Sequence, residues 1–337
     1  EGSKVCKSNW PMGNADGVIS KAAAKIKCCI QLRDGLLLDE DLKVAWFHPV
    51  EMRWTDEPIE ETEYNAETRE IRFTTVSVGS IAVVQDRLMD LCYESWSLRP
   101  VMLPGGAGEV HLSIKTPRYL VTIVVGDDGL CRLASPEVEP LASLRQKRSS
   151  PGDLLYALQS AGLSLLPTKE AAAEAKYFEA SQPGVTLKHT NLNTMLCDSV
   201  ARLSTSFDFK SSRWSNSLGS ERACLQVKET DAFTGGTTLV DYSMLLLEFD
   251  SGSSSAVNAP GLGECPGGIK ASLVRNSEGP SFRAFDDFSL GQGEIHVGEC
   301  LRSIATEEAM KRVDESEDLL GVSVGSLLRA TGVFSFC

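Results

Sequence analysis

The residues that could carry chemistry are few, and their spacing does not bring them together. The four histidines stand far apart, and none has a His, Cys or carboxylate partner at the spacing of a metal site. They are His48, His111, His189 and His296. His111 falls in an alternating pattern and is expected on the surface of a sheet. The sequence also lacks a P-loop, an HExxH pattern and an EF-hand loop, so it predicts no catalytic, cofactor-binding or metal-binding residues.

One pattern matches a known nucleophile motif. The segment Gly321-Val322-Ser323-Val324-Gly325 reads GxSxG, in which the serine of an α/β-hydrolase lies on a strained turn between a strand and a helix. Here the pattern falls inside an expected helix, and no histidine follows it to complete a triad. We therefore expect that the protein is not an enzyme, and a serine hydrolase with Ser323 as its nucleophile remains an alternative.

The composition is that of a globular protein with a strong negative charge. The chain has 337 residues, of which 42% are apolar and 23% charged, and its formal net charge is −13. Such a charge disfavours nucleic acids and anionic membrane surfaces, because their phosphates would be repelled. No apolar run reaches the roughly 18 residues of a membrane-spanning helix, and no apolar leader opens the chain. We expect no nucleic-acid or membrane partner.

The cysteines and tryptophans are expected to be structural. The ten cysteines form no CxxC pair and no regular framework, and no Asn-x-Ser/Thr acceptor site occurs, which favours a reducing intracellular compartment. Cys131, Cys197 and Cys224 lie at apolar positions inside expected elements, where a thiol behaves as a small hydrophobic group. Trp54 and Trp96 lie in or beside expected strands, and we expect both in the core rather than at a binding surface.

A run of β-strands from Arg69 to Leu133 organises the first part of the chain. Its apolar residues alternate with polar ones, as a half-buried strand requires. The turn Asp127-Asp128-Gly129 lies between two apolar runs and predicts a hairpin, which is a better interpretation than a calcium site without further ligands. With more strands expected before Arg69, residues 1–134 are predicted to form an antiparallel β-sandwich-like domain.

The second part is predicted to be a mixed α+β domain over residues 151–337. Residues 135–150 combine prolines with a basic cluster and are predicted to be the linker. Ser150 is expected to cap the first helix, and the chain is expected to end in two helices. A Gly/Ser-rich insert is predicted near residues 251–268. The fold class is therefore α+β and β-rich, a sandwich-like domain followed by an α+β domain with C-terminal helices.

Particular segments resemble a known family. The segment Tyr93–Pro100 (YESWSLRP) follows Ala82–Asp86 (AVVQD), Pro49–Trp54 precedes both, and four later landmarks come in the matching order. These are LLYALQSAGLSLLP at 154–167, STSFDFKSSRW at 204–214, EAMKRV at 308–313 and LLRATGVFSF at 327–336. Together they resemble the carboxyl-terminal region of the cancer susceptibility candidate 1 family, which is also known as an accessory intermediate chain of the axonemal inner-arm dynein f.

The resemblance implies a function without supplying catalytic residues. It implies a non-catalytic accessory subunit of a ciliary or flagellar inner-arm dynein, which contributes to motor assembly or regulation through protein–protein contacts. It implies dynein heavy, intermediate and light chains as partners, with tubulin of the doublet microtubule as a further candidate. The expected place is the cytoplasm, the cytoskeleton and the axoneme. The alternative is a cytosolic β-sandwich scaffold or a dynein assembly factor that is not held stably in the axoneme.

Overall fold

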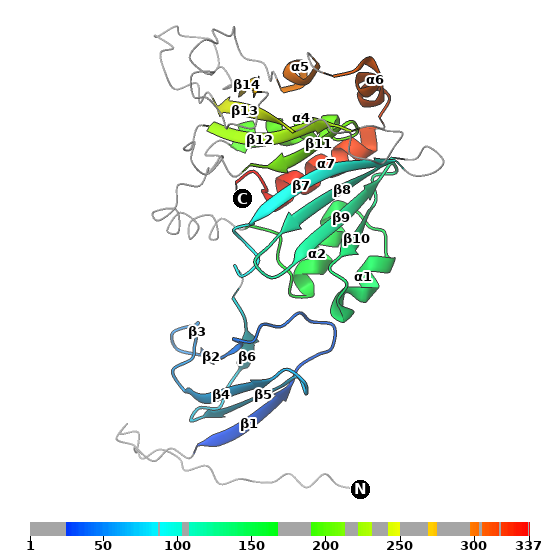
Figure 1. Cartoon of the computed structure of the whole chain (residues 1–337). Coiled ribbons are helices and arrows are strands. Elements are labelled where there is room, and N and C mark those ends of the chain that lie inside the picture. Colours follow the sequence, from blue (N-terminus) through cyan, green and yellow to red (C-terminus); the bar gives the residue numbers. More distant parts are fainter. Residues whose placement is uncertain are drawn as a thin grey trace, which may run out of the picture. The chain divides into compact units, whose positions relative to one another are not determined.

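The structure is a computed structural model of the chain, and it contains two compact units. One unit comprises residues 1–34 and 38–86, and the other comprises residues 35–37 and 87–337 (Figure 1). The residues that the structure describes are 25–86, 88–102, 108–167, 190–212, 222–230, 242–249, 269–274, 297–302, 305–316, 318–335 and 337.

The smaller unit is a sandwich-like pair of antiparallel sheets. One sheet has the strand order β1-β5-β4, and the other has the order β3-β2-β6. The strands are β1 (Ile26–Gln31), β2 (Lys43–His48), β3 (Arg53–Thr55), β4 (Ile59–Asn65), β5 (Glu70–Thr75) and β6 (Ile81–Val84). Val44 of β2 and Ile71 and Phe73 of β5 are buried in one cluster, so the two sheets share a core. This burial is what makes six short strands a stable unit.

The larger unit is built on one eight-stranded antiparallel sheet. Its strand order is β10-β9-β8-β7-β11-β12-β13-β14, so β7 pairs with both β8 and β11. The strands are β7 (Ser95–Met102), β8 (Gly108–Lys115), β9 (Leu120–Gly126), β10 (Cys131–Ser135), β11 (Phe207–Ser211), β12 (Arg222–Glu229), β13 (Ser243–Phe249) and β14 (Ile269–Val274). The pairs Phe209↔Leu98 and Lys210↔Ser97 join two stretches that lie more than a hundred residues apart in the sequence.

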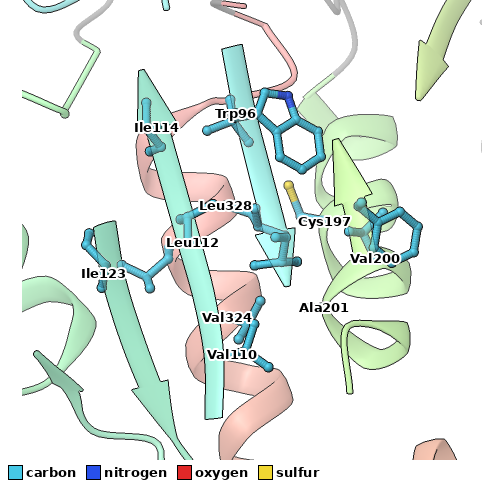
Figure 2. Packing of buried hydrophobic residues seen from close by; sticks show 14 of the residues in the cluster. Trp96, Val110, Leu112, Ile114, Ile123, Cys197, Val200, Ala201, Val324 and Leu328 are labelled. Atoms are coloured by element: carbon cyan, nitrogen blue, oxygen red, sulfur yellow. The ribbon is translucent and has the colours of Figure 1, made fainter. Parts of the chain in front are cut away.

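Helices cover one face of this sheet. They are η1 (Glu139–Leu141), α1 (Ala142–Gln146), α2 (Pro151–Ser160), α4 (Thr190–Leu203), α5 (Val297–Arg302), α6 (Glu307–Glu315) and α7 (Asp318–Thr331). Figure 1 shows α2 and α7 along one side of β7 to β10. Figure 2 shows side chains of the strands packed with Val324 and Leu328 of α7 and with Cys197 and Val200 of α4. Alternate strand residues therefore form one continuous core with these helices.

Polar side chains fix the chain segments that leave this core. Asp90 is fully buried and accepts two hydrogen bonds from Arg118, at 2.8 and 2.7 Å. Arg118 also donates to the carbonyl of Gly162, and Asp90 accepts from the backbone N–H of Ser164. A buried charge is tolerated when it is paired and hydrogen-bonded in this way. The ion pair thereby holds the loop before β7, the turn between β8 and β9, and the end of α2 together.

Several local predictions are confirmed, as is the β-rich α+β fold class with antiparallel sheets and C-terminal helices. The Asp127-Asp128-Gly129 turn joins β9 and β10, and Gly129 has the positive φ of +76° that the turn requires. The side chain of Ser150 accepts a hydrogen bond from the N–H of Asp153 at the start of α2. Trp96 is buried, and Cys131, Cys197 and Cys224 are fully buried.

Residues 135–150 and the domain limits differ from the prediction. The compact units do not divide at residues 134 and 151, because one sheet contains strands from both sides of that boundary. Residues 139–146 form η1 and α1, and Leu141 is fully buried against the core. Cys131 and Ser149 exchange two backbone hydrogen bonds, at 2.8 and 3.0 Å. The prolines and charges of this segment indicated a linker, and no local pattern showed that Leu141 would pack into the core. The segment is therefore part of the fold.

Trp54 also departs from the prediction, since it is 49% exposed. It pairs with Phe47 across β2 and β3, and their rings meet edge to face at 5.3 Å. Val44, whose side chain is in the core, lies on the other face of β2 because side chains alternate. The sequence pattern identified the strand correctly but not the face. The Gly/Ser-rich insert predicted at 251–268 lies outside the described residues.

The buried ion pair gives a test of stability. Replacement Asp90→Asn removes the buried carboxylate that accepts two hydrogen bonds from Arg118, and we expect it to lower the free energy of unfolding by about 3–5 kcal/mol in urea titrations. The matched control is Glu137→Gln, which removes an exposed pair with Arg145 and should change stability by about 1 kcal/mol or less. Equal effects of the two variants would contradict the role given to Asp90.

The buried thiols give a second test. Burial raises the pKa of Cys131 and of Cys197 to about 12, because the thiolate is disfavoured away from water. At pH 8 we expect iodoacetamide to modify exposed Cys29 in the native protein and to leave Cys131 and Cys197 unmodified, as measured by peptide mass spectrometry. In urea all three should react. If Cys131 and Cys197 were modified as fast as Cys29 in the absence of urea, the result would contradict their burial.

Candidate interaction surface

We call the face of the eight-stranded sheet that points away from α2, α4 and α7 the outer face. Polar side chains predominate on it along β7, β8 and β11, whereas Val124, Cys224, Met244 and Leu246 on the same face are apolar and buried. Cross-strand pairing places its residues side by side. Its described polar members are Ser97 and Arg99 of β7, Glu109, His111, Ser113 and Lys115 of β8, Thr122 of β9, Arg132 of β10, Asp208 and Lys210 of β11, and Gln226 and Lys228 of β12. Each alternates with a buried core residue along its strand.

Two rows of side chains cross this face. In one row, Lys210 pairs with Ser97, and Ser97 pairs with Ser113. The hydroxyls of Ser113 and Thr122 extend it with a 3.0 Å hydrogen bond. The outer face therefore presents hydroxyl groups in a line perpendicular to the strands.

The other row holds charged groups. Arg99 pairs with His111 across β7 and β8, and Arg132 follows on β10 beyond Val124. Arg132 donates to Glu109 Oε2 at 3.2 Å, and the ring Nε2 of His111 lies 3.4 Å from the same oxygen. One carboxylate thus lies between two basic side chains at the β8–β10 end of the row.

A cluster of opposite and like charges lies at the other end of the row. Arg99 Nε donates to Asp208 Oδ2 at 3.0 Å, and the Tyr242 hydroxyl donates to the same oxygen at 2.7 Å. The ammonium groups of Lys210 and Lys228 lie 3.9 and 5.9 Å from the centre of the Tyr242 ring. Cations are attracted to the negative face of an aromatic ring, so Tyr242 helps to hold them together.

The electrostatics of this cluster follow from its partial burial. Burial, the hydrogen bond to Asp208 and the charge of that carboxylate together raise the pKa of Tyr242 to about 12, against a smaller opposing effect of Arg99. Burial also lowers the pKa of Lys210; the charges of Arg99 and Lys228 lower it as well, whereas Asp208 opposes the shift. The buried Asp208 carboxylate therefore acts on both Arg99 and Lys210.

The charge of the outer face is opposite in sign to that of the chain. Among its described side chains, five are cationic and two are carboxylates, without counting His111. They are Arg99, Lys115, Arg132, Lys210 and Lys228 against Glu109 and Asp208. The whole chain carries a net charge of −13. Positive charge is thus concentrated on this face.

A cavity of about 320 Å³ lies at one end of the sheet. It is lined by Pro100, Met102, Gly108, Glu109, Val110, Asp127, Thr205, Arg312, Glu315, Ser316 and Leu320. Its volume is near the lower limit of ligand pockets, which is about 300 Å³. Its charged side chains are of both signs, and two of the four are in ion pairs, Glu109 with Arg132 and Glu315 with Lys311. The lining therefore favours no particular class of ligand.

The residues examined for chemistry do not converge. His48 lies in the smaller unit, where its Nδ1 accepts from the N–H of Glu51, and His111 lies on the outer face, as predicted. His189 and His296 are outside the described residues. Ser323 lies within α7, in regular helix, and not on the strained turn that a nucleophile elbow needs. In the described ranges, no group of three or more His, Cys, Asp or Glu side chains could hold a metal ion.

The outer face could be found only in part from the sequence. Alternation along β7 and β8 puts Arg99, His111 and Lys115 on one side of their strands. Nothing in the sequence indicates that β11 pairs with β7, so Lys210 and Asp208 could not be assigned to the same surface. Among the helices described, none is long and apolar enough to cross a membrane.

The chain is similar in sequence to three curated proteins of animals. It is 26% identical to a relative from Ciona intestinalis over 233 residues, which is 67% of this chain and 30% of the relative. It is 23% identical to a Bos taurus relative over 316 residues and 22% identical to a Homo sapiens relative over 318 residues, each time 92% of this chain and 39% of the relative. No protein-family model matches the chain.

All three relatives are named as axonemal dynein intermediate chains. The bovine and human proteins are called dynein axonemal intermediate chain 7, and the Ciona protein is called a homolog of it. The similarity supports a relationship to axonemal dynein intermediate chains. The chain spans 39% or less of the length of these three relatives.

The charge cluster gives a test at this surface. Replacement Asp208→Asn removes the carboxylate that disfavours the phenolate of Tyr242, so the pKa of Tyr242 should fall from about 12 toward its ordinary value. The tyrosinate absorbance, taken as a difference against Tyr242→Phe in each background, measures this pKa. Ser113→Ala changes the same face away from Tyr242 and should leave the pKa unchanged. An unshifted pKa in the Asp208→Asn protein would mean that the hydrogen bond is absent.

Proposed function

We propose that this chain belongs to a non-catalytic accessory subunit, an intermediate chain, of a ciliary or flagellar axonemal dynein. The observation that carries the proposal is the similarity over 92% of the chain to proteins named dynein axonemal intermediate chain 7. The segments that resemble the cancer susceptibility candidate 1 family suggest, more specifically, the inner-arm dynein f. The subunit would contribute to assembly or regulation of the motor in the axoneme.

The fold supports a role in protein–protein contacts. Each unit has its own buried core, so it can present a fixed surface to a neighbouring chain. The outer face carries groups that bind other proteins through charge and hydrogen bonds. Dynein heavy, intermediate and light chains are the partners proposed, with tubulin of the doublet microtubule as a further candidate.

Fractionation of flagellated cells tests the proposal. A tagged form of the protein should remain with washed axonemes and leave them in the high-salt extract that releases dynein. Cross-linking mass spectrometry of that extract should then link lysines of this chain to dynein heavy or intermediate chains. Radial-spoke proteins, which are axonemal but not dynein subunits, serve as the control for extraction.

Two other results would contradict the proposal, and each would favour a different function. A protein that stays in the cytoplasmic fraction and is absent from the extract would favour a scaffold or a dynein assembly factor. Reaction of Ser323 with a fluorophosphonate label, lost in Ser323→Ala, would instead favour the serine hydrolase.

A further inference from the structure

The start of helix α7 exposes apolar side chains on the side opposite the core. Leu319 is 58% exposed and Val322 is 60% exposed, whereas Leu320 and Val324 of the same helix are buried. Residues three apart lie on one face of a helix, so Leu319 and Val322 form a short apolar stripe that faces solvent. A contiguous apolar surface of this kind indicates an interaction site.

The turn between β9 and β10 lies against this stripe. A Cβ atom built on Gly129 would lie 3.3 Å from the Cβ of Leu319 and 3.0 Å from the hydroxyl oxygen of Ser323. The turn therefore packs against the first turns of α7. The residue after Gly129 is Leu130, another exposed apolar residue, at 39%. We call Leu130, Leu319 and Val322 the α7 patch.

Exposed carboxylates lie around the α7 patch. They are Asp127 and Asp128 of the turn, Asp153 in the first turn of α2, Glu315 at the end of α6 and Asp318 at the start of α7. Asp127 and Glu315 line one cavity together with Leu320, which places the end of α6 beside the turn. The start of α2 is held at the same turn, because Arg148 pairs with Asp128 at 2.6 Å.

Only part of this negative charge is compensated. Asp128 pairs with Arg148, and Glu315 pairs with Lys311 at 3.6 Å. In the part of the chain that the structure describes, the other three carboxylates take part in no ion pair. Carboxylates outnumber cations here even when Arg312, which lines the cavity, is counted. The apolar surface therefore has an acidic border.

We infer that the α7 patch binds an amphipathic helix of a partner protein, with Lys or Arg residues beside its apolar stripe. The stripe would cover Leu319 and Val322, and the cations would meet the surrounding carboxylates. A second copy of this chain would bring the same carboxylates face to face, and an anionic membrane would also be repelled. The inference rests on the proposed function and deepens it, because it names the chemistry of one contact that the subunit would make.

The test is a titration of the purified 337-residue chain with fluorescein-labelled peptides in about 0.15 M salt, followed by fluorescence anisotropy. The first peptide, of about 15 residues, has Leu at every third or fourth position and Lys elsewhere, so it forms a basic amphipathic helix. A second peptide replaces every Lys with Glu, and a third has the composition of the first in scrambled order. We expect the first to bind about tenfold more tightly than either of the others.

One pair of variants tests the apolar contact. Leu319→Gln/Val322→Gln removes the stripe and keeps residues that suit an exposed helix. The matched control, Leu120→Gln/Val78→Gln, changes one exposed leucine and one exposed valine outside the α7 patch. We expect the first variant to weaken binding of the basic amphipathic peptide about tenfold and the control less than about twofold.

A second pair of variants tests the charges. Asp127→Asn/Asp318→Asn removes two carboxylates of the border and should weaken binding about threefold. Its control, Asp41→Asn/Asp56→Asn, has the same net charge, is changed at exposed residues of the smaller unit, and should bind like the parent chain. Because the border carboxylates are exposed, this pair gives the answer even if the glutamine variant of α7 does not fold.

Several results would overturn the inference. They are the absence of saturable binding of the basic amphipathic peptide, equal binding of the scrambled peptide, and an equal loss in a variant and its control. A dimer in light scattering that becomes a monomer in Leu319→Gln/Val322→Gln would do the same, because a second copy would then occupy the α7 patch. The titration contains no dynein subunit, so its failure leaves the fractionation experiment untouched. Conversely, a chain that stays out of the axoneme can still bind the peptide.

Discussion

The antiparallel pairing of β7 with β11 is the constraint on which the larger unit depends. Phe209 opposite Leu98 continues the core, so helices from both parts of the sequence pack on one hydrophobic layer. Lys210 opposite Ser97 continues the outer face, and the same pairing brings Asp208 beside Arg99. One set of backbone hydrogen bonds therefore produces both the core and the charged surface. Because side chains alternate, a shift of one residue would exchange the two faces.

Buried polar contacts specify how the remaining segments meet this sheet. The Tyr93 hydroxyl donates to the carbonyl of Thr331 at 2.9 Å, and it lies 3.3 Å from the carbonyl of Leu165. Burial raises the pKa of this phenol, which keeps it a donor. The Asp90–Arg118 pair acts in the same region. Such groups cost energy to bury and are satisfied in only a few arrangements, so they select one packing of α7 and the loops over others.

The features predicted correctly from the sequence are those determined by residues close together in the chain. The cap at Ser150 and the turn at Gly129 depend on residues close together in the chain, and both were found. The domain limits depended on strand pairing between distant segments, which leaves no local pattern, so a linker was expected where Leu141 packs into the core. Trp54 shows a related difficulty, because alternation gives two faces without saying which is buried. The outer face combines both problems, since its members come from strands on either side of the expected boundary.

The two hydrogen bonds between Cys131 and Ser149 have a consequence for self-association. Strand β10 is the last in its sheet, and an open edge strand offers unpaired backbone groups to any other extended chain. Ser149 occupies the N–H and C=O of Cys131 on that side, and the chain then turns into α2. A second copy therefore finds the first residue of this edge already paired. The segment after β10 thus shortens the open edge that another chain could join, which disfavours edge-to-edge polymerisation at β10.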